Sequence, residues 1–194
     1  GGVKLSGPGS TSNILENCTS HGLSVYTSGG TDHVIRDFEF VRTSLSGNVL
    51  SLASTGLDER TTVRNGIVRG GSSSLVVKSC KDCTVDNVKL SGAWTHGIEL
   101  NGAENLTIKN SILMAATANG EPGPFIKNAK NVTFINNAFL RGWWLPSISY
   151  GCGLTGSVVI RNNIFYHAGT GAPHGQLEGA ECPDPPADWP PTLD

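Results

Sequence analysis

Two residues with acid–base side chains, His96 and Glu99, lie three positions apart at the start of a predicted strand. An imidazole and a carboxylate that reach one substrate can act as general acid and general base. Side chains of a strand point alternately to opposite faces, so this spacing separates the pair unless the backbone bends between them. Arg141 and His167, on a neighbouring loop, would add a cation and a second imidazole. His96, Glu99, Arg141 and His167 are therefore the candidate catalytic residues.

A second group of large cationic and aromatic side chains follows the strands that end each repeat. Guanidinium groups pair with carboxylates, and aromatic faces stack on flat ligands. Such a surface would suit an acidic or a neutral glycan. The same side chains could instead cover the edge of the core where loops leave the strands, and the sequence leaves both roles open. The candidates are Arg42, Arg69, Trp94, Trp143, Trp144 and Tyr150.

The positions of these residues depend on a repeat of twenty-odd residues. The motif of an apolar residue, any residue and then Asn recurs along the chain, with IRD as one variant and LEN as a weaker one. Its positions follow one another at intervals of 20, 28, 22, 23, 26 and 26 residues. A period of this length in strand-forming sequence indicates stacked coils of parallel strands. The repeated positions are Asn17, Asp37, Asn65, Asn87, Asn110, Asn136 and Asn162.

A column of asparagines has a physical reason. A carboxamide both donates and accepts hydrogen bonds, so stacked Asn side chains can bond from coil to coil. Asn also tolerates the tight turn conformation of a sharp corner. An apolar residue lies two positions before each corner, and usually another lies three positions after it. Stacked at about 4.8 Å per coil, these apolar columns would form the core, beside an inward-facing Asn ladder.

Repeats such as NLTIKNSIL, NVTFINNAFL and SVVIRNNIFY resemble those of the pectate-lyase-like superfamily of right-handed parallel β-helices. The resemblance covers roughly residues 2–180 and implies an all-β solenoid of about seven coils. It leaves activity open, because one fold carries many functions. We expect the β-helix over residues 1–182. A Pro-rich extended tail or linker would follow over 183–194, because proline cannot donate to a sheet.

Enzymes of this superfamily carry recognisable residue patterns. Its polygalacturonases place Asp pairs on adjacent coils with GHG and RIK motifs, and its lyases hold calcium with clustered carboxylates beside an Arg or Lys base. Here the HG pairs at His21, His96 and His174 lack the first Gly, no Asp-Asp pair or RIK occurs, and the acidic residues are scattered. We therefore expect no metal and no cofactor, with calcium only if the chain is a lyase.

The five cysteines add a constraint on the fold. Cys80 and Cys83 lie in one turn as CKDC, where a local disulfide or two buried thiols is favoured over zinc, because no second pair follows at ligand spacing. Cys152 and Cys182 are 30 residues apart, about one coil, which suits a bridge between neighbouring coils. Cys18 would lie about three coils from Cys80, too far for a bridge.

Composition favours an extracellular protein without a strong electrostatic partner. Net charge is −2 and the 14 Lys and Arg form no basic run, which argues against nucleic acid. No apolar segment reaches membrane-spanning length. Cysteines in a β protein rich in small residues suit an oxidising compartment. Sequons at Asn105 and Asn131 are candidate glycosylation sites if the source is eukaryotic, although Asn also favours turns there. A third sequon, at Asn17, would lie in the ladder, and we expect no glycan on it.

Two functions from different classes fit these residues. Uncapped end coils would expose strand edges and the apolar cross-section of the core, so copies could stack end to end or join a larger chain. We predict an extracellular solenoid module with a structural or assembly role, or one that binds polysaccharide or cell-wall and matrix glycans. The alternative is a polysaccharide lyase or epimerase that acts on uronate-containing glycans.

Overall fold

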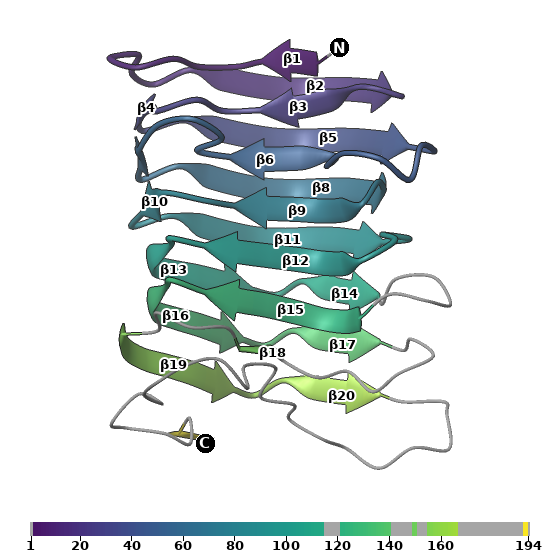
Figure 1. The fold of residues 1–194 in the computed structure, drawn as a ribbon, viewed down its shortest axis with the longest axis vertical. Helices are drawn as coiled ribbons and strands as arrows, with labels where there is room; N and C mark the ends of the chain where they lie inside the picture. Colours follow the sequence, from purple (N-terminus) through teal and green to yellow (C-terminus); the bar gives the residue numbers. More distant parts are fainter. Residues whose placement is uncertain (1, 115–120, 141–148, 151–154, 167–191, 194) are drawn as a thin grey trace.

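The computed structural model describes the chain except residues 1, 115–120, 141–148, 151–154, 167–191 and 194. Its strands wind into flattened coils that stack along one axis (Figure 1). One side of the stack is a seven-stranded parallel sheet, the first sheet. Its strands are β1 (Gly2–Lys4), β3 (Ser24–Tyr26), β6 (Leu50–Leu52), β9 (Ser73–Val77), β12 (His96–Asn101), β15 (Glu121–Lys127) and β18 (Ser149–Tyr150).

The other side is a fourteen-stranded parallel sheet, the second sheet, which bends around each coil. Four long strands, β2 (Ile14–His21), β5 (Val34–Arg42), β8 (Thr62–Gly70) and β11 (Thr84–Ser91), run through the bend. In later coils the strand is split there into β13 (Glu104–Lys109) and β14 (Ile112–Met114), β16 (Lys130–Ile135) and β17 (Ala138–Leu140), and β19 (Thr155–Arg161) and β20 (Ile164–Tyr166). The short strands β4 (Gly30–Thr31), β7 (Asp58–Glu59) and β10 (Cys80–Lys81) line the corner between the two sheets.

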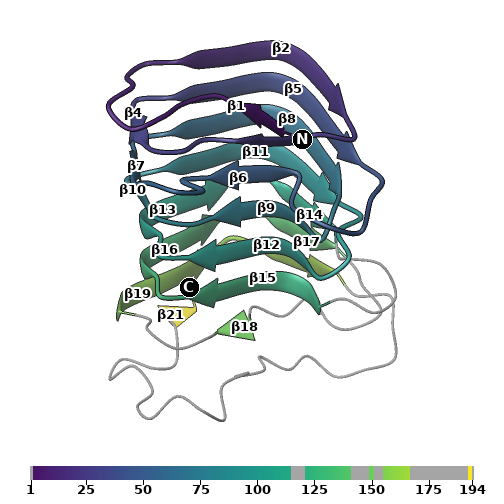
Figure 2. The same ribbon diagram turned by 45° about the horizontal axis from the view of Figure 1, so that its top comes forward.

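The predicted all-β parallel solenoid is confirmed, with about five complete turns rather than seven. Each complete turn has one strand of the first sheet followed by two of the second: β3 to β5, β6 to β8, β9 to β11, β12 to β14 and β15 to β17. Figure 2 shows the two sheets as separate walls of the stack. Most of the predicted tail, 183–191 and 194, lies outside the described residues, and β21 (Thr192–Leu193) pairs with β19.

Each coil bends sharply at the repeated Asn or Asp. All seven repeat positions have left-handed φ angles between 51° and 55°, a conformation that Asn and Asp tolerate better than other residues with side chains. Their side chains are exposed, so the expectation of an inward ladder at these positions is wrong. The left-handed residue interrupts the alternation of the strand, and two consecutive side chains, such as Arg36 and Asp37, turn away from the core.

An inward polar ladder does exist, one position after the bend. The side chains of Ser111, Asn137 and Asn163 accept hydrogen bonds from the backbone N–H one coil earlier. Ser111 N donates to Asn137 Oδ1 at 2.9 Å, and Asn137 N donates to Asn163 Oδ1 at 2.8 Å. Asn137 Nδ2 donates to the carbonyl of Ile108 at 2.9 Å. These side-chain hydrogen bonds replace backbone pairing just after the bend, and the later strands are split at this position.

The core lies between the two sheets. The apolar column predicted two positions before the bend is buried from Ile35 to Ile160, and the column three positions after it is buried from Phe40 to Phe139. In the first coils the inward position just past the bend is apolar, and the Phe38 and Phe40 rings stack with centroids 4.5 Å apart. The core of the early coils is therefore apolar at a place where the later coils use hydrogen bonds.

Candidate functional site

The bends of successive coils leave a groove on the outside of the stack, here called the bend groove. It crosses five coils, is open to solvent and has a volume of about 590 Å³. That volume lies in the range of small-molecule sites. One wall of the groove is the row of exposed side chains at the bend: Asn17, Asp37, Asn65, Asn87 and Asn110.

The opposite wall of the bend groove comes from the side chains two positions after the bend. Their strands pair in register, so these side chains also form one row along the stack. The row mixes polar, charged and apolar residues: Thr19, Glu39, Ile67, Lys89 and Ile112. Cys18, Phe38, Gly66 and Val88 complete the lining.

Hydrogen bonds hold the bend row in place. Asn65 Nδ2 donates to Asp37 Oδ1 at 3.2 Å, and Asn87 Nδ2 donates to Asn65 Oδ1 at 3.0 Å. Asn110 Nδ2 donates instead to Asp86 Oδ1 at 2.8 Å. A carboxamide has two donor and two acceptor positions. The bonds of Asn65 use one of each, so the row keeps hydrogen-bonding capacity toward the groove.

The charges of the groove differ in how they are compensated. The charge of Asp37 has a nearby cation, because Arg36 Nε lies 3.9 Å from Asp37 Oδ2. The same Nε also donates to Glu16 Oε2 at 2.7 Å. Neither Glu39 nor Lys89 forms a salt bridge with another residue of the described part of the chain. These two side chains are therefore open to a ligand.

The candidate catalytic pair lies on the first sheet, where the pairing of β12 with β15 shifts register between His96 and Ile98. The His96 ring stacks on Phe125, the cross-strand neighbour of Glu99, with ring centroids 5.1 Å apart. Lys127 Nζ lies 3.6 Å from Glu99 Oε1 and 5.3 Å from the Phe125 centroid. Bulges re-aim side chains in this way. Both candidates thus adjoin one aromatic residue, and Arg141 and His167 lie outside the described residues.

Comparison with known proteins places the chain in a family. The model of the right-handed β-helix region matches residues 2–139 and 51–176. The chain belongs to the right-handed β-helix family. Among solved structures, it is similar to the enzymatically active domain of tailspike protein 2 from bacteriophage CBA120, with 12% identity and a TM-score of 0.41. The match covers 87% of this chain and 37% of that chain. No curated protein sequence matches this chain.

Three of the predicted glycan-binding residues of this β-helix have described side chains, Arg42, Arg69 and Trp94, and glycan binding by them stays a prediction. Arg42 pairs in register with Gly70 rather than with Arg69. Its Nη1 donates to Ser24 Oγ at 2.6 Å, which holds Arg42 at the end of β5, whereas Arg69 is exposed and Trp94 half-buried. Trp143 and Trp144 lie outside the described residues, and Tyr150 belongs to β18.

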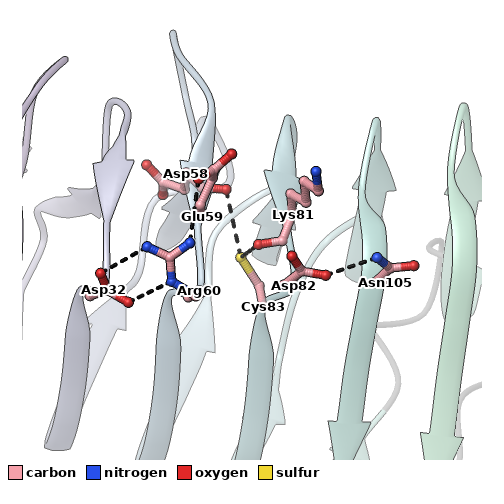
Figure 3. Close-up of polar contacts among 8 residues, drawn as sticks. All are labelled: Asp32, Asp58, Glu59, Arg60, Lys81, Asp82, Cys83 and Asn105. Atoms are coloured by element: carbon pink, nitrogen blue, oxygen red, sulfur yellow. Dashed lines mark hydrogen bonds and ion pairs between the residues drawn. The ribbon is translucent and has the colours of Figure 1, made fainter.

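A second row of left-handed residues follows the corner between the sheets, with φ from 53° to 58° at Asp32, Arg60, Asp82, Asn105 and Asn131. Figure 3 shows the first four of them. Arg60 bonds both carboxylate oxygens of Asp32, Nε to Oδ1 at 2.7 Å and Nη2 to Oδ2 at 2.9 Å. These bonds lower the pKa of Asp32 and raise the pKa of Arg60. The sequence carried a signal for this row, because Asp or Asn recurs just before, or at the start of, four strands of the second sheet: β5, β11, β13 and β16.

The two sequon asparagines belong to this corner row. Asn105 Nδ2 donates to Asp82 Oδ1 at 2.8 Å, and Asn131 Nδ2 donates to Asn105 Oδ1 at 3.0 Å. Glycosylation of Asn105 and Asn131 stays a prediction, and each amide nitrogen already bonds the coil before it. Asn17 is exposed in the bend groove. The expectation that its side chain faces inward, which was the reason for expecting no glycan there, is therefore wrong.

The local disulfide predicted for the CKDC turn is confirmed, since Cys80 and Cys83 are bonded to each other. Both residues are buried, and the Cys83 sulfur lies 3.4 Å from the carbonyl oxygen of Lys81 (Figure 3). Cys18 is a free thiol whose pKa is raised by burial. Cys152 and Cys182 lie outside the described residues. The disulfide lies at the corner one coil after β7, because Cys80 of β10 pairs in register with Asp58 of β7.

A buried carboxylate that sequence reasoning missed stands at the same corner. Asp58 is fully buried. Its Oδ1 accepts a hydrogen bond from Gly29 N at 2.8 Å, and its Oδ2 accepts one from Ala53 N at 2.9 Å and another from the Thr27 hydroxyl. Buried carboxylates persist where donors satisfy them. Asp58 therefore ties its own coil to the coil before it.

Within the described ranges, no group of three or more His, Cys, Asp and Glu side chains could hold a metal ion. The described residues also include no helix that could cross a membrane.

Proposed function

We propose that this β-helix is a glycan-binding module whose ligand occupies the bend groove. The observation that supports the proposal is a row of four exposed carboxamides and one carboxylate facing a partly apolar row across five coils. Carboxamides can donate to and accept from sugar hydroxyls. The half-buried side chain of Ile67 and the exposed side chain of Ile112 can pack against the C–H faces of sugar rings. A site of this kind combines apolar packing with a few oriented polar groups.

A peptide strand is a poorer ligand for this groove. Peptides that add to a sheet need an unpaired strand edge with open N–H and C=O groups. In the bend groove β5, β8 and β11 are each paired with a strand on both sides. The groove therefore offers side chains rather than backbone, which favours a ligand rich in hydroxyl groups.

An extracellular location is part of the proposal. The disulfide between Cys80 and Cys83 supports it, because disulfides form and persist in oxidising compartments. End-to-end association of the solenoid is a separate proposal. Sedimentation over a concentration series would reveal it as a mass that grows in whole multiples of the chain.

The second candidate function is a polysaccharide lyase or epimerase, favoured by the register shift that brings His96 and Glu99 to Phe125. Lys127 beside Glu99 adds a cation that such chemistry could use. Assays of uronate polysaccharides for unsaturated or epimerised products would test it. Turnover that is lost in His96→Ala and Glu99→Gln would support the enzyme. Absence of turnover, or turnover that is unchanged in both variants, would exclude His96 and Glu99 as catalytic residues.

The groove is tested by one matched pair of substitutions in affinity electrophoresis through gels that contain soluble polysaccharides. Ile112 lines the groove and is 38% exposed, whereas Ile164 lies two coils later in the same row, is 64% exposed and lies outside the groove. We expect Ile112→Ala to weaken retardation about fivefold, through loss of apolar contact, and Ile164→Ala to leave it unchanged. Equal behaviour of the two variants would overturn the groove as the binding site.

A further inference from the structure

The charges of the bend groove narrow the class of its ligand, provided that the groove binds a glycan as proposed. We infer that the ligand is an uncharged linear glycan that lies along the axis of the stack. Two observations lead to this inference: the sign and spacing of the charged lining residues, and the direction in which the polar and apolar rows run.

The lining residues include two carboxylates and one ammonium group, Asp37, Glu39 and Lys89. Glu39, Ile67 and Lys89 follow one another in register, so Glu39 and Lys89 are two coils apart, about 10 Å. A polyanion that paired with Lys89 and continued toward the first coils would bring its next charge to Glu39, and a further one to Asp37, whose charge Arg36 at 3.9 Å offsets in part. Like charges at such sites repel. An uncharged glycan meets no such repulsion.

The two rows also set the direction of the ligand. The bend row and the opposite row both run along the stack, with one side chain per coil at intervals of about 4.8 Å. A linear chain that lies along the axis meets one polar side chain of the bend row at each coil. It also meets Ile67 and Ile112, which alternate with Lys89 in the opposite row. A chain that lay across the axis would meet only one side chain of the bend row.

The test compares polymers that differ only in charge. Hydroxyethyl and carboxymethyl derivatives of the same soluble glucan carry substituents of similar size, and the same pair can be made from a mannan and a xylan. We expect affinity electrophoresis at low salt to show at least fivefold tighter binding of the uncharged derivative of one backbone. Added salt should reduce this difference, because screening weakens exposed charges.

Two variants locate the effect. Glu39→Gln removes a groove carboxylate, and we expect the ratio of carboxymethyl to hydroxyethyl affinity to rise about two- to fivefold. Glu104→Gln is the matched control, because Glu104 lies outside the groove beside Lys130, and it should leave that ratio unchanged. Tighter binding of the carboxymethyl derivative, lost in Lys89→Gln, would overturn the inference and leave the glycan-binding proposal standing. Failure of every polymer to bind would overturn the proposed function itself.

Discussion

The ring of Phe38 occupies the space that Gly66 leaves open on the next coil. A Cβ atom on Gly66 would lie 2.2 Å from the Phe38 ring, closer than any real contact. Phe38 and Gly66 are paired in register, so the large and the absent side chain are complementary. This pairing fills the core beneath the bend groove and fixes the groove's inner wall.

Gly66→Ala should therefore destabilise the protein by about 1–3 kcal/mol, because the Phe38 ring must move into a packed core. Chemical denaturation monitored by circular dichroism measures the change. Gly97→Ala is the matched control, because its Cβ would meet only the Met114 carbonyl oxygen, at 3.9 Å. If both alanine variants unfold at the same denaturant concentration, Phe38 does not depend on Gly66.

Asp58→Ala should cost about 3 kcal/mol of unfolding free energy, since it leaves two buried donors, Gly29 N and the Thr27 hydroxyl, without their acceptor. Ala53 N keeps a second acceptor, Thr27 Oγ1 at 2.8 Å. The neighbouring Glu59 has a half-exposed side chain and contacts Arg60 at 3.5 Å. Glu59→Ala should change stability by less than about 1 kcal/mol. Equilibrium unfolding in urea compares the two, and equal losses would contradict a clamping role for Asp58.

The pair of Asp32 and Arg60 predicts a small acid dependence of stability. Hydrogen bonds from Arg60 lower the pKa of Asp32, so its folded pKa lies below its unfolded pKa. The stabilisation is therefore present above the unfolded pKa, near 4, and is lost as pH falls through the lower folded value. Both groups are exposed, so the effect should be modest.

Arg60→Gln should return the pKa of Asp32 to its ordinary range and remove this acid dependence. Titration of the Asp32 carboxyl by nuclear magnetic resonance measures the shift in both proteins. A titration midpoint that is the same in the wild type and in Arg60→Gln would show that the corner pair has no electrostatic effect.

Asn137→Ala should destabilise the later coils by about 2 kcal/mol, because Ser111 N and the Ile108 carbonyl lose their buried partner. Native-state hydrogen exchange should show the largest loss of protection at Ser111. The matched control is Ser157→Ala, a side chain on an exposed part of β19. Unchanged exchange at Ser111 in Asn137→Ala would mean that the inward ladder does not hold the bend.

The period of the sequence by itself determined the solenoid and the places where each coil bends. Local sequence is enough to predict these features. Asn and Asp accept the left-handed conformation of the bend, and the apolar residues at fixed distances from it stack on the apolar residues of the next coil. The CKDC disulfide was accessible for a similar reason, since its two cysteines share one turn.

Only the tertiary structure decided which way the side chains at the bends face. A left-handed residue interrupts the two-residue alternation, so Asn136 turns outward and Asn137 inward, although the sequence reads simply as NN. The register shift between β12 and β15 likewise places His96 on Phe125, which strict alternation does not anticipate. The bend groove, the Phe38 and Gly66 pair and the Asp58 clamp all join different coils. Their geometry depends on how one coil is set upon the next, and no single repeat contains it.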